Sequence, residues 1–175
     1  MLILNTRIDF FRERPGMVIA ELGVFKGDFS RQLLEYNPET LWMVDTWSGA
    51  MSCGDKDGRN IVNVADMADV YKVVTFEFSK PNVIVYRGAS TDFLSFIEDD
   101  TLDCVYIDTT HEYEMTLHEL MLSRGKVKPG GWVTGHDYNV SSVANAVNEF
   151  CELYSLTIEY LTEDGNPSFY IRNVK

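Results

Sequence analysis

Residues 104–114 read CVYIDTTHEYE, and this stretch decides the fold. An apolar run ends at Asp108, and His111 follows three residues later. A short apolar run that is rich in β-branched and aromatic residues is typical of a buried strand. The pattern therefore predicts a strand over residues 101–108 that delivers a carboxylate and an imidazole at its exit.

Similar apolar runs alternate with helical periods along the whole chain. Strands are predicted at 17–22, 41–45, 82–88, 101–108 and 130–137, and helices at 27–36, 61–78, 112–125 and 140–154. The last two runs, 156–161 and 168–174, predict a closing antiparallel pair. Strands that alternate with helices indicate a doubly wound, Rossmann-like α/β fold with a mostly parallel sheet. In such sheets ligands bind outside the carboxyl ends of the strands.

Length and charge narrow the function. The chain has 175 residues, which predicts a single domain (residues 1–175) that opens with a short N-terminal segment, 1–14. Its net charge of −12 argues against nucleic acid as a partner, and no apolar run is long enough to indicate a membrane partner. The three cysteines fit neither a zinc pattern nor a disulfide framework, so we expect a reducing, cytoplasmic setting.

The first predicted strand ends in a glycine-rich turn. Gly23 and Gly27 flank three residues, and glycine permits close approach by a ligand; a plain strand-to-helix turn is the alternative. Glu21, late in a buried strand, needs a partner for its carboxylate. The glycine spacing differs from the dinucleotide fingerprint, which disfavours a dehydrogenase.

The second and third strand exits also carry polar side chains. Asp45 follows the glycine-rich turn by about 20 residues, a position suited to ribose hydroxyls, although a helix cap or turn role is equally open for it alone. Ala89 and Ser90 follow the third strand, where they either contact a base edge or cap the next helix.

The fourth and fifth exits each combine an aspartate with a histidine, Asp108 with His111 and His136 with Asp137. Carboxylates that converge there repel one another unless a cation or protons intervene. Oxygen-rich sets suit Mg²⁺, Ca²⁺ or Mn²⁺, and a nearby imidazole suits proton removal from a hydroxyl. The alternative is that Asp–His hydrogen bonds merely stiffen the loops.

Other polar groups receive simpler interpretations. His118 is expected at or near a helix surface, and a solvated helix face is expected for Glu112, Glu114 and Glu119. Residues 48–66 form a candidate lid loop. Within it, residues 55–58 lack the spacing and the final glutamate of a calcium loop.

In this order, the motifs resemble those of class I S-adenosylmethionine (SAM)-dependent methyltransferases over roughly residues 15–174. AELGVFKGDFS (20–30) resembles the glycine-rich first motif, and VDTW (44–47) resembles the ribose-binding second motif. DCVYIDTTHEYE (103–114) and KPGGWVTGHDY (128–138) resemble the fourth and fifth strands of metal-dependent macrocin- and mycinamicin-type small-molecule O-methyltransferases.

The resemblance implies a class I methyltransferase fold and a set of site residues. SAM would lie near Glu21, Gly23, Gly27, Asp45, Ala89, Ser90 and Asp108. Asp108, His136 and Asp137 would bind a divalent metal, Mg²⁺ or Mn²⁺, and His111 would be the general base for a hydroxylated small-molecule acceptor. His136 stands where the subgroup has Asp or Glu. Either its nitrogen binds the metal, which would shift the metal preference toward Mn²⁺, Fe²⁺ or Zn²⁺, or the metal site has been lost.

Three other functions stay open. One is a methyltransferase that needs no metal, and another is a non-catalytic SAM-binding sensor or partner subunit. The third is an iron oxygenase that uses Asp108, His111 and His136 as its ligands. The sequence leaves a homo-oligomer open as well, with a lid supplied by a neighbouring subunit.

Overall fold

The computed structural model describes residues 1–48 and 64–175, with side chains from residue 67 onward in the second range. The strands of this part are β1 (Leu2–Leu4), β2 (Val18–Leu22), β3 (Thr40–Asp45), β4 (Val83–Arg87), β5 (Leu102–Ile107), β6 (Val127–Gly135), β7 (Ile158–Thr162) and β8 (Phe169–Arg172). The helices are η1, a 3-10 helix (Arg7–Phe11), α1 (Asp28–Leu34), α2 (Val64–Glu77), α3 (Ser90–Phe96), α4 (Tyr113–Lys126) and α5 (Ser141–Tyr154).

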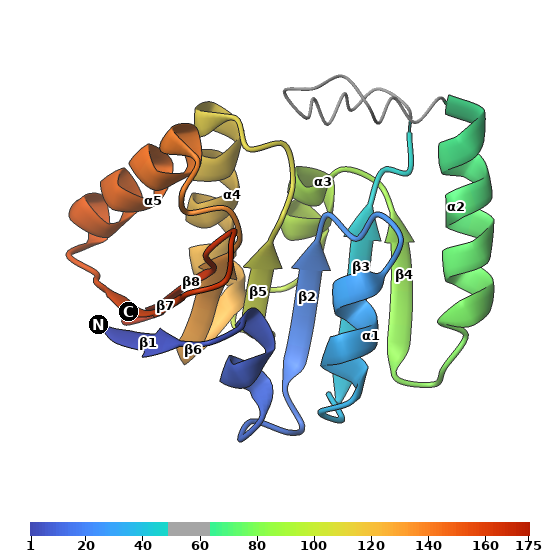
Figure 1. Ribbon diagram of the computed structural model, residues 1–175, viewed down its shortest axis with the longest axis horizontal. Helices are drawn as coiled ribbons and strands as arrows, with labels where there is room; N and C mark the ends of the chain where they lie inside the picture. Colours follow the sequence, from blue (N-terminus) through green and yellow to red (C-terminus); the bar gives the residue numbers. More distant parts are fainter. Residues whose placement is uncertain (49–63) are drawn as a thin grey trace.

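The described strands form one sheet in the order β1-β7-β8-β6-β5-β2-β3-β4 (Figure 1). Neighbouring strands are parallel except β8, which is antiparallel to both β6 and β7. From β2 the chain proceeds outward through β3 and β4, whereas from β5 it proceeds the opposite way through β6. The strand order therefore reverses between β2 and β5, and such a reversal is where open α/β sheets bind ligands.

Helices cover both faces of the sheet. On one face, α3, α4 and α5 contribute residues such as Phe93, Leu120 and Val147 to a core cluster. On the other face, η1, α1 and α2 contribute Phe10, Leu33 and other side chains to a second cluster. This arrangement confirms the predicted fold class, a mostly parallel sheet with a closing antiparallel pair.

Short or irregular elements escaped prediction. The strand β1 has three residues and η1 has five, which is too short for a hydrophobic period to show. β6 begins at Val127, three residues before the predicted strand 130–137, and its pairing with β5 shifts register between Leu102 and Cys104. α4 continues one residue past Gly125, where the predicted helix ends.

None of the helices in the described ranges combines the length and hydrophobicity that a membrane-spanning segment requires. The predicted lid loop 48–66 falls largely on residues 49–63, outside the described residues, as do Cys53 and the discounted calcium-loop segment 55–58.

Candidate functional site

The glycine-rich turn brings the exit of β2 against the exit of β5. Gly23 has a φ of +92°, and a Cβ atom there would lie 1.8 Å from the backbone oxygen of Asp108. Gly27, the residue before α1, has a φ of +78°, and its Cβ would lie 2.6 Å from the ring of Phe78. Contacts within the protein therefore require glycine at both positions, and close approach by a ligand stays a prediction.

Glu21 has the partner that its position in a buried strand demands. The side chain is 2% exposed, and the hydroxyl of Ser30 on α1 donates a hydrogen bond to Glu21 Oε2. Burial raises the pKa of Glu21 to about 8 because the ionised carboxylate loses its water, an effect that the Ser30 hydrogen bond opposes. Glu21 thus joins β2 to α1 just below the sheet edge.

Asp45 fixes the backbone around the first and second exits. Its Oδ2 accepts a hydrogen bond from the backbone N–H of Phe25 at 2.8 Å, and Oδ1 accepts one from that of Trp47 at 2.8 Å. This is the turn role that the sequence left open. Each carboxylate oxygen has a second lone pair, so a contact with ribose hydroxyls stays a compatible prediction. Trp47 is 1% exposed and belongs to the core.

The exit of β4 is tied to that of β5 through a buried carboxylate. The Ser90 hydroxyl donates to Glu119 Oε1, and the Thr109 hydroxyl donates to Oε2 at 2.7 Å. Ala89 occupies the cap position of α3, and Ser90 makes no cap hydrogen bond there. The Ser90 side chain therefore points to α4 instead of capping its own helix.

Glu119 corrects one expectation from the sequence. A solvated helix face was predicted for this residue, but its side chain is 0% exposed, whereas Glu112 and Glu114 are exposed as expected. Burial outweighs the hydrogen bonds from Ser90 and Thr109 and raises the pKa of Glu119 above its usual value. The signal was present in the helix period, because the buried residues of α4 share one face: Thr116, Glu119, Leu120 and Ser123.

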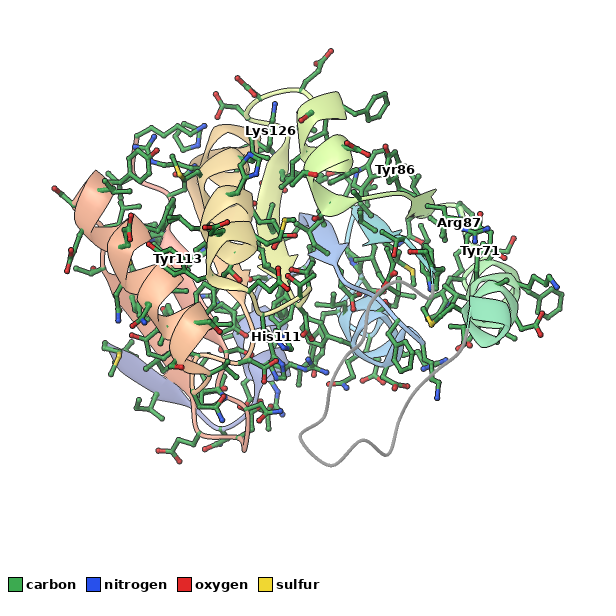
Figure 2. All side chains as sticks on the ribbon, turned by 90° about the horizontal axis from the view of Figure 1, so that it is seen from above. Tyr71, Tyr86, Arg87, His111, Tyr113 and Lys126 are labelled. Atoms are coloured by element: carbon green, nitrogen blue, oxygen red, sulfur yellow. The ribbon has the colours of Figure 1, made fainter. Side chains whose placement is uncertain are left out.

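Two aspartates and two histidines converge at the exits of β5 and β6. His111 Nε2 lies 2.9 Å from Asp137 Oδ2 and 3.6 Å from Asp108 Oδ1. His136 Nδ1 lies 3.2 Å from Asp137 Oδ2 and 3.6 Å from Asp108 Oδ2. All four residues that the sequence singled out at these exits therefore meet. Figure 2 looks onto this edge of the sheet, with His111 near its centre.

The backbone is held in an uncommon conformation on both sides of this cluster. His111 has a φ of +59° and Asp137 a φ of +58°, in the left-handed region that few residues other than glycine adopt. The hydroxyl of Ser142 on α5 donates a 2.6 Å hydrogen bond to the backbone oxygen of His111. Such strained positions persist only where surrounding contacts support them, and they gather at functional sites.

Opposite charges face each other in the cluster. The neighbouring carboxylates, Asp108 first and Asp137 second, raise the pKa of His111 to about 10. Burial opposes ionisation of Asp137, but His111 and His136 outweigh it and hold the pKa of this carboxyl below its usual range. In this arrangement His111 carries the positive charge that balances one of the carboxylates.

Arg7, in η1, adds a second positive charge that sequence reasoning missed. Its Nη1 lies 3.6 Å from Asp108 Oδ2, and its guanidinium carbon lies 4.2 Å from the centre of the Phe29 ring. The residue belongs to the N-terminal segment that the sequence set apart. No local signal marks it, because the folded chain alone brings this segment to the sheet edge.

The donor set fits a divalent cation. Within the described part of the chain, one ligand atom each of Asp108, His111 and Asp137 lies within 4.8 Å of the others. His111 Nε2 is buried and, despite its short distance to Asp137, makes no hydrogen bond of acceptable geometry. The two carboxylates would be ligands of a cation, and the His111 nitrogen could join them only after its ring loses its proton. His136 lies beside this trio, while His118 is exposed on α4.

The chain was compared with known families, curated proteins and solved structures. Residues 20–138 match a family described as a methyltransferase domain. No curated protein matches the chain. Among solved structures, the O-methyltransferase NovP has 22% sequence identity and a TM-score of 0.70, with 97% of this chain and 80% of that one covered.

Two further structures show the same fold at lower identity. A SAM-dependent methyltransferase from Aquifex aeolicus has 14% identity and a TM-score of 0.66, covering 95% of this chain and 87% of that one. Spermidine synthase from Thermotoga maritima has 12% identity and a TM-score of 0.62, covering 96% of this chain and 57% of that one. The family match covers more than half of the chain. The chain belongs to the class I SAM-dependent methyltransferase domain family.

Proposed function

We propose that this methyltransferase moves the methyl group of SAM to a hydroxyl of a small molecule, with help from a divalent cation. The observation that carries the proposal is the convergence of Asp108, His111 and Asp137 at the exits of β5 and β6. The fold likeness to the O-methyltransferase NovP agrees with a hydroxyl acceptor. In this proposal residues 1–175 act as one domain.

In this proposal the carboxyl ends of different strands bind different parts of SAM and the cation. Glu21, Gly23, Gly27 and Asp45 hold the methionine and ribose parts of SAM, and Ala89 and Ser90 hold the base. Asp108 and Asp137 supply carboxylate oxygens to the cation, with His136 as the nitrogen next to them. When bound, the cation would lower the pKa of the acceptor hydroxyl and fix its geometry.

The protein's own task is orientation and proton removal. The two carboxylates position an acceptor beside Asp108, which also lies against the turn at Gly23. This proximity supplies much of the rate, because the methyl donor is already activated. His111 takes the proton of the hydroxyl. The carboxylates of Asp108 and Asp137 raise the pKa of His111, so its ring is protonated when nothing else binds them. His111 can act as a base only when another positive charge, such as the cation, offsets the two carboxylates.

Chelation followed by metal addition tests the proposal. The protein is treated with EDTA, and formation of S-adenosylhomocysteine is measured with catechol-like and sugar acceptors, with and without Mg²⁺ or Mn²⁺. We expect turnover that metal restores and that Asp137→Ala abolishes. Turnover that ignores both EDTA and Asp137→Ala would refute metal assistance, and absence of turnover on every acceptor would favour a non-catalytic SAM-binding protein.

One observation favours a second candidate, transfer without a metal. Arg7 and His111 together place two positive charges against Asp108 and Asp137, so the cluster is balanced without an ion. In that case Asp108 and His111 would orient the acceptor through hydrogen bonds alone. Activity that survives chelation but falls on Arg7→Ala would select this alternative.

A further inference from the structure

Two hydroxyl groups at the sheet edge share one buried carboxylate. Ser90, at the exit of β4, donates to Glu119 Oε1, and Thr109, at the exit of β5, donates to Glu119 Oε2. Ser90 and Thr109 are half-buried, whereas Glu119 is fully buried behind them on α4. A buried carboxylate is costly unless hydrogen bonds satisfy it, and these two bonds account for one acceptor site on each of its oxygens.

This arrangement sets the direction of any further hydrogen bond at Ser90. A hydroxyl has one proton to donate and two lone pairs to accept with. The hydroxyls of Ser90 and Thr109 are the donors in these two bonds, so the protons of both point to Glu119. The Ser90 oxygen is then left with acceptor capacity alone toward a ligand. A ligand group that meets it must be a donor.

The position of Ser90 in the fold says which ligand group that is. Asp45 ends β3, and β4 is the next strand outward, with Asp45 opposite Arg87 in the register. If Asp45 receives the ribose of SAM, the base extends toward the exit of β4, where Ser90 lies. The adenine edge carries a 6-amino donor, which a 6-oxo purine replaces with an acceptor.

We propose that Glu119 is a specificity-determining residue, which orients the Ser90 hydroxyl so that it accepts from an amino group and rejects a 6-oxo purine. The inference rests on the SAM-dependent function and on the base lying at the exit of β4. Glu119 acts through Ser90 and does not touch the nucleoside. Thr109 supplies the second donor that keeps the carboxylate satisfied.

The expected discrimination follows from unpaired acceptors. An oxo group placed against an oxygen without a proton leaves two acceptors facing each other, and an unsatisfied polar group of this kind typically weakens binding by about tenfold or more. Sites built around a specific hydrogen bond reject the analogue that lacks it for the same reason. The discrimination should therefore depend on Glu119 even though the nucleoside contacts Ser90.

Paired binding measurements test the inference. Dissociation constants for S-adenosylhomocysteine and S-inosylhomocysteine are measured by calorimetry in mildly alkaline buffer, for the unmodified protein and for Glu119→Met. Methionine has a similar length and no strong acceptor, so the hydroxyls of Ser90 and Thr109 both lose the partner that fixes their direction. We expect the preference for the adenosyl compound to fall by about tenfold, mainly because the inosyl compound binds more tightly.

Three further variants make the result specific. Glu114→Met changes an exposed glutamate on the same helix and should leave the preference unchanged. Glu119→Gln keeps an acceptor for one hydroxyl and should give a preference no greater than that of the unmodified protein. Ser90→Ala leaves Glu119 in place, so it answers the question even if Glu119→Met does not fold; it should weaken adenosyl binding and reduce the preference.

Several outcomes would overturn the inference. The first is that the unmodified protein binds the adenosyl and inosyl compounds equally well. The second is that Glu119→Met and Ser90→Ala both keep the preference for the adenosyl compound. The third is that the protein does not bind S-adenosylhomocysteine. These measurements need neither acceptor nor metal. If Glu119→Met and Ser90→Ala both keep the preference for the adenosyl compound while the protein shows metal-dependent turnover, only the role of Glu119 is refuted. If the preference changes but no acceptor is methylated, only the proposed reaction is refuted.

Discussion

His111 Nε2 lies 2.9 Å from Asp137 Oδ2, yet the two atoms are not aligned for a hydrogen bond. The ring is held there by a left-handed backbone conformation and by Ser142, which binds the backbone oxygen of His111. The same geometry fits the proposed site, in which a cation would lie between the carboxylates and the imidazole would face an acceptor hydroxyl. The proposed roles of Asp137 in metal binding and of His111 in proton removal can therefore be tested separately.

We expect His111→Ala to lower kcat by roughly 10² to 10⁴, the usual loss when a general base is removed. Asp137→Asn should instead weaken divalent-metal binding, because the cation loses a charged ligand. Turnover and metal stoichiometry by calorimetry are measured on both variants. His118→Ala, an exposed histidine on α4, is the control. Loss of the metal in His111→Ala would make His111 a ligand, and an unchanged rate would remove its role as base.

Arg7 predicts a competition between the protein's own cation and a metal ion. Its guanidinium lies 3.6 Å from Asp108 Oδ2 and weakens the attraction of that carboxylate for a further cation. Arg7→Ala should therefore raise Mn²⁺ affinity several-fold, on the order of the 1 kcal/mol or more that one partly exposed charge contributes. Arg12→Ala, in the same segment but paired with Asp9, is the matched control. Equal metal affinity in both variants would mean that Arg7 does not act on the site.

Glu21 predicts a pH dependence of stability with a definite sign. Burial raises the pKa of Glu21 from 4.5 to about 8, so the folded state binds the proton more tightly than the unfolded chain does. The resulting stabilisation is complete below about pH 4.5 and is lost as the pH rises through about 8. Relative to Glu21→Gln, the unmodified protein should lose a few kcal/mol of unfolding free energy across this window.

Urea denaturation of both proteins at several pH values checks this prediction. Glutamine keeps an oxygen that accepts from Ser30 but does not titrate, so Glu21→Gln isolates the ionisation. Glu35→Gln, at an exposed position just after α1, is the control. Parallel stability curves for the unmodified protein and Glu21→Gln would show that Glu21 ionises in the folded state as easily as in the unfolded chain.

The sequence predicted most of the sheet because its central strands are strongly apolar and separated by helical periods. It also placed Asp108, His111, His136 and Asp137 together, since the carboxyl ends of neighbouring parallel strands meet at one edge. Arg7 and Glu119 were missed for different physical reasons. Arg7 reaches the site only through the tertiary packing of η1 on Phe29. Glu119 is a charged residue on a buried helix face, and its partners come from two other elements.

Gly23 gives the most direct test of how the exits of β2 and β5 are joined. A Cβ atom at Gly23 would lie 1.8 Å from the backbone oxygen of Asp108, and the φ of +92° is unfavourable for any other residue. Gly23→Ala must therefore separate the two exits or unfold the sheet edge, and we expect a loss of at least about 3 kcal/mol of stability. Gly165→Ala, where a Cβ would have no atom within 4 Å, should change stability by less than about 1 kcal/mol. Urea denaturation measures both. If Gly23→Ala were as stable as Gly165→Ala, the close packing of this turn against Asp108 would be wrong, and the site built on it would need another geometry.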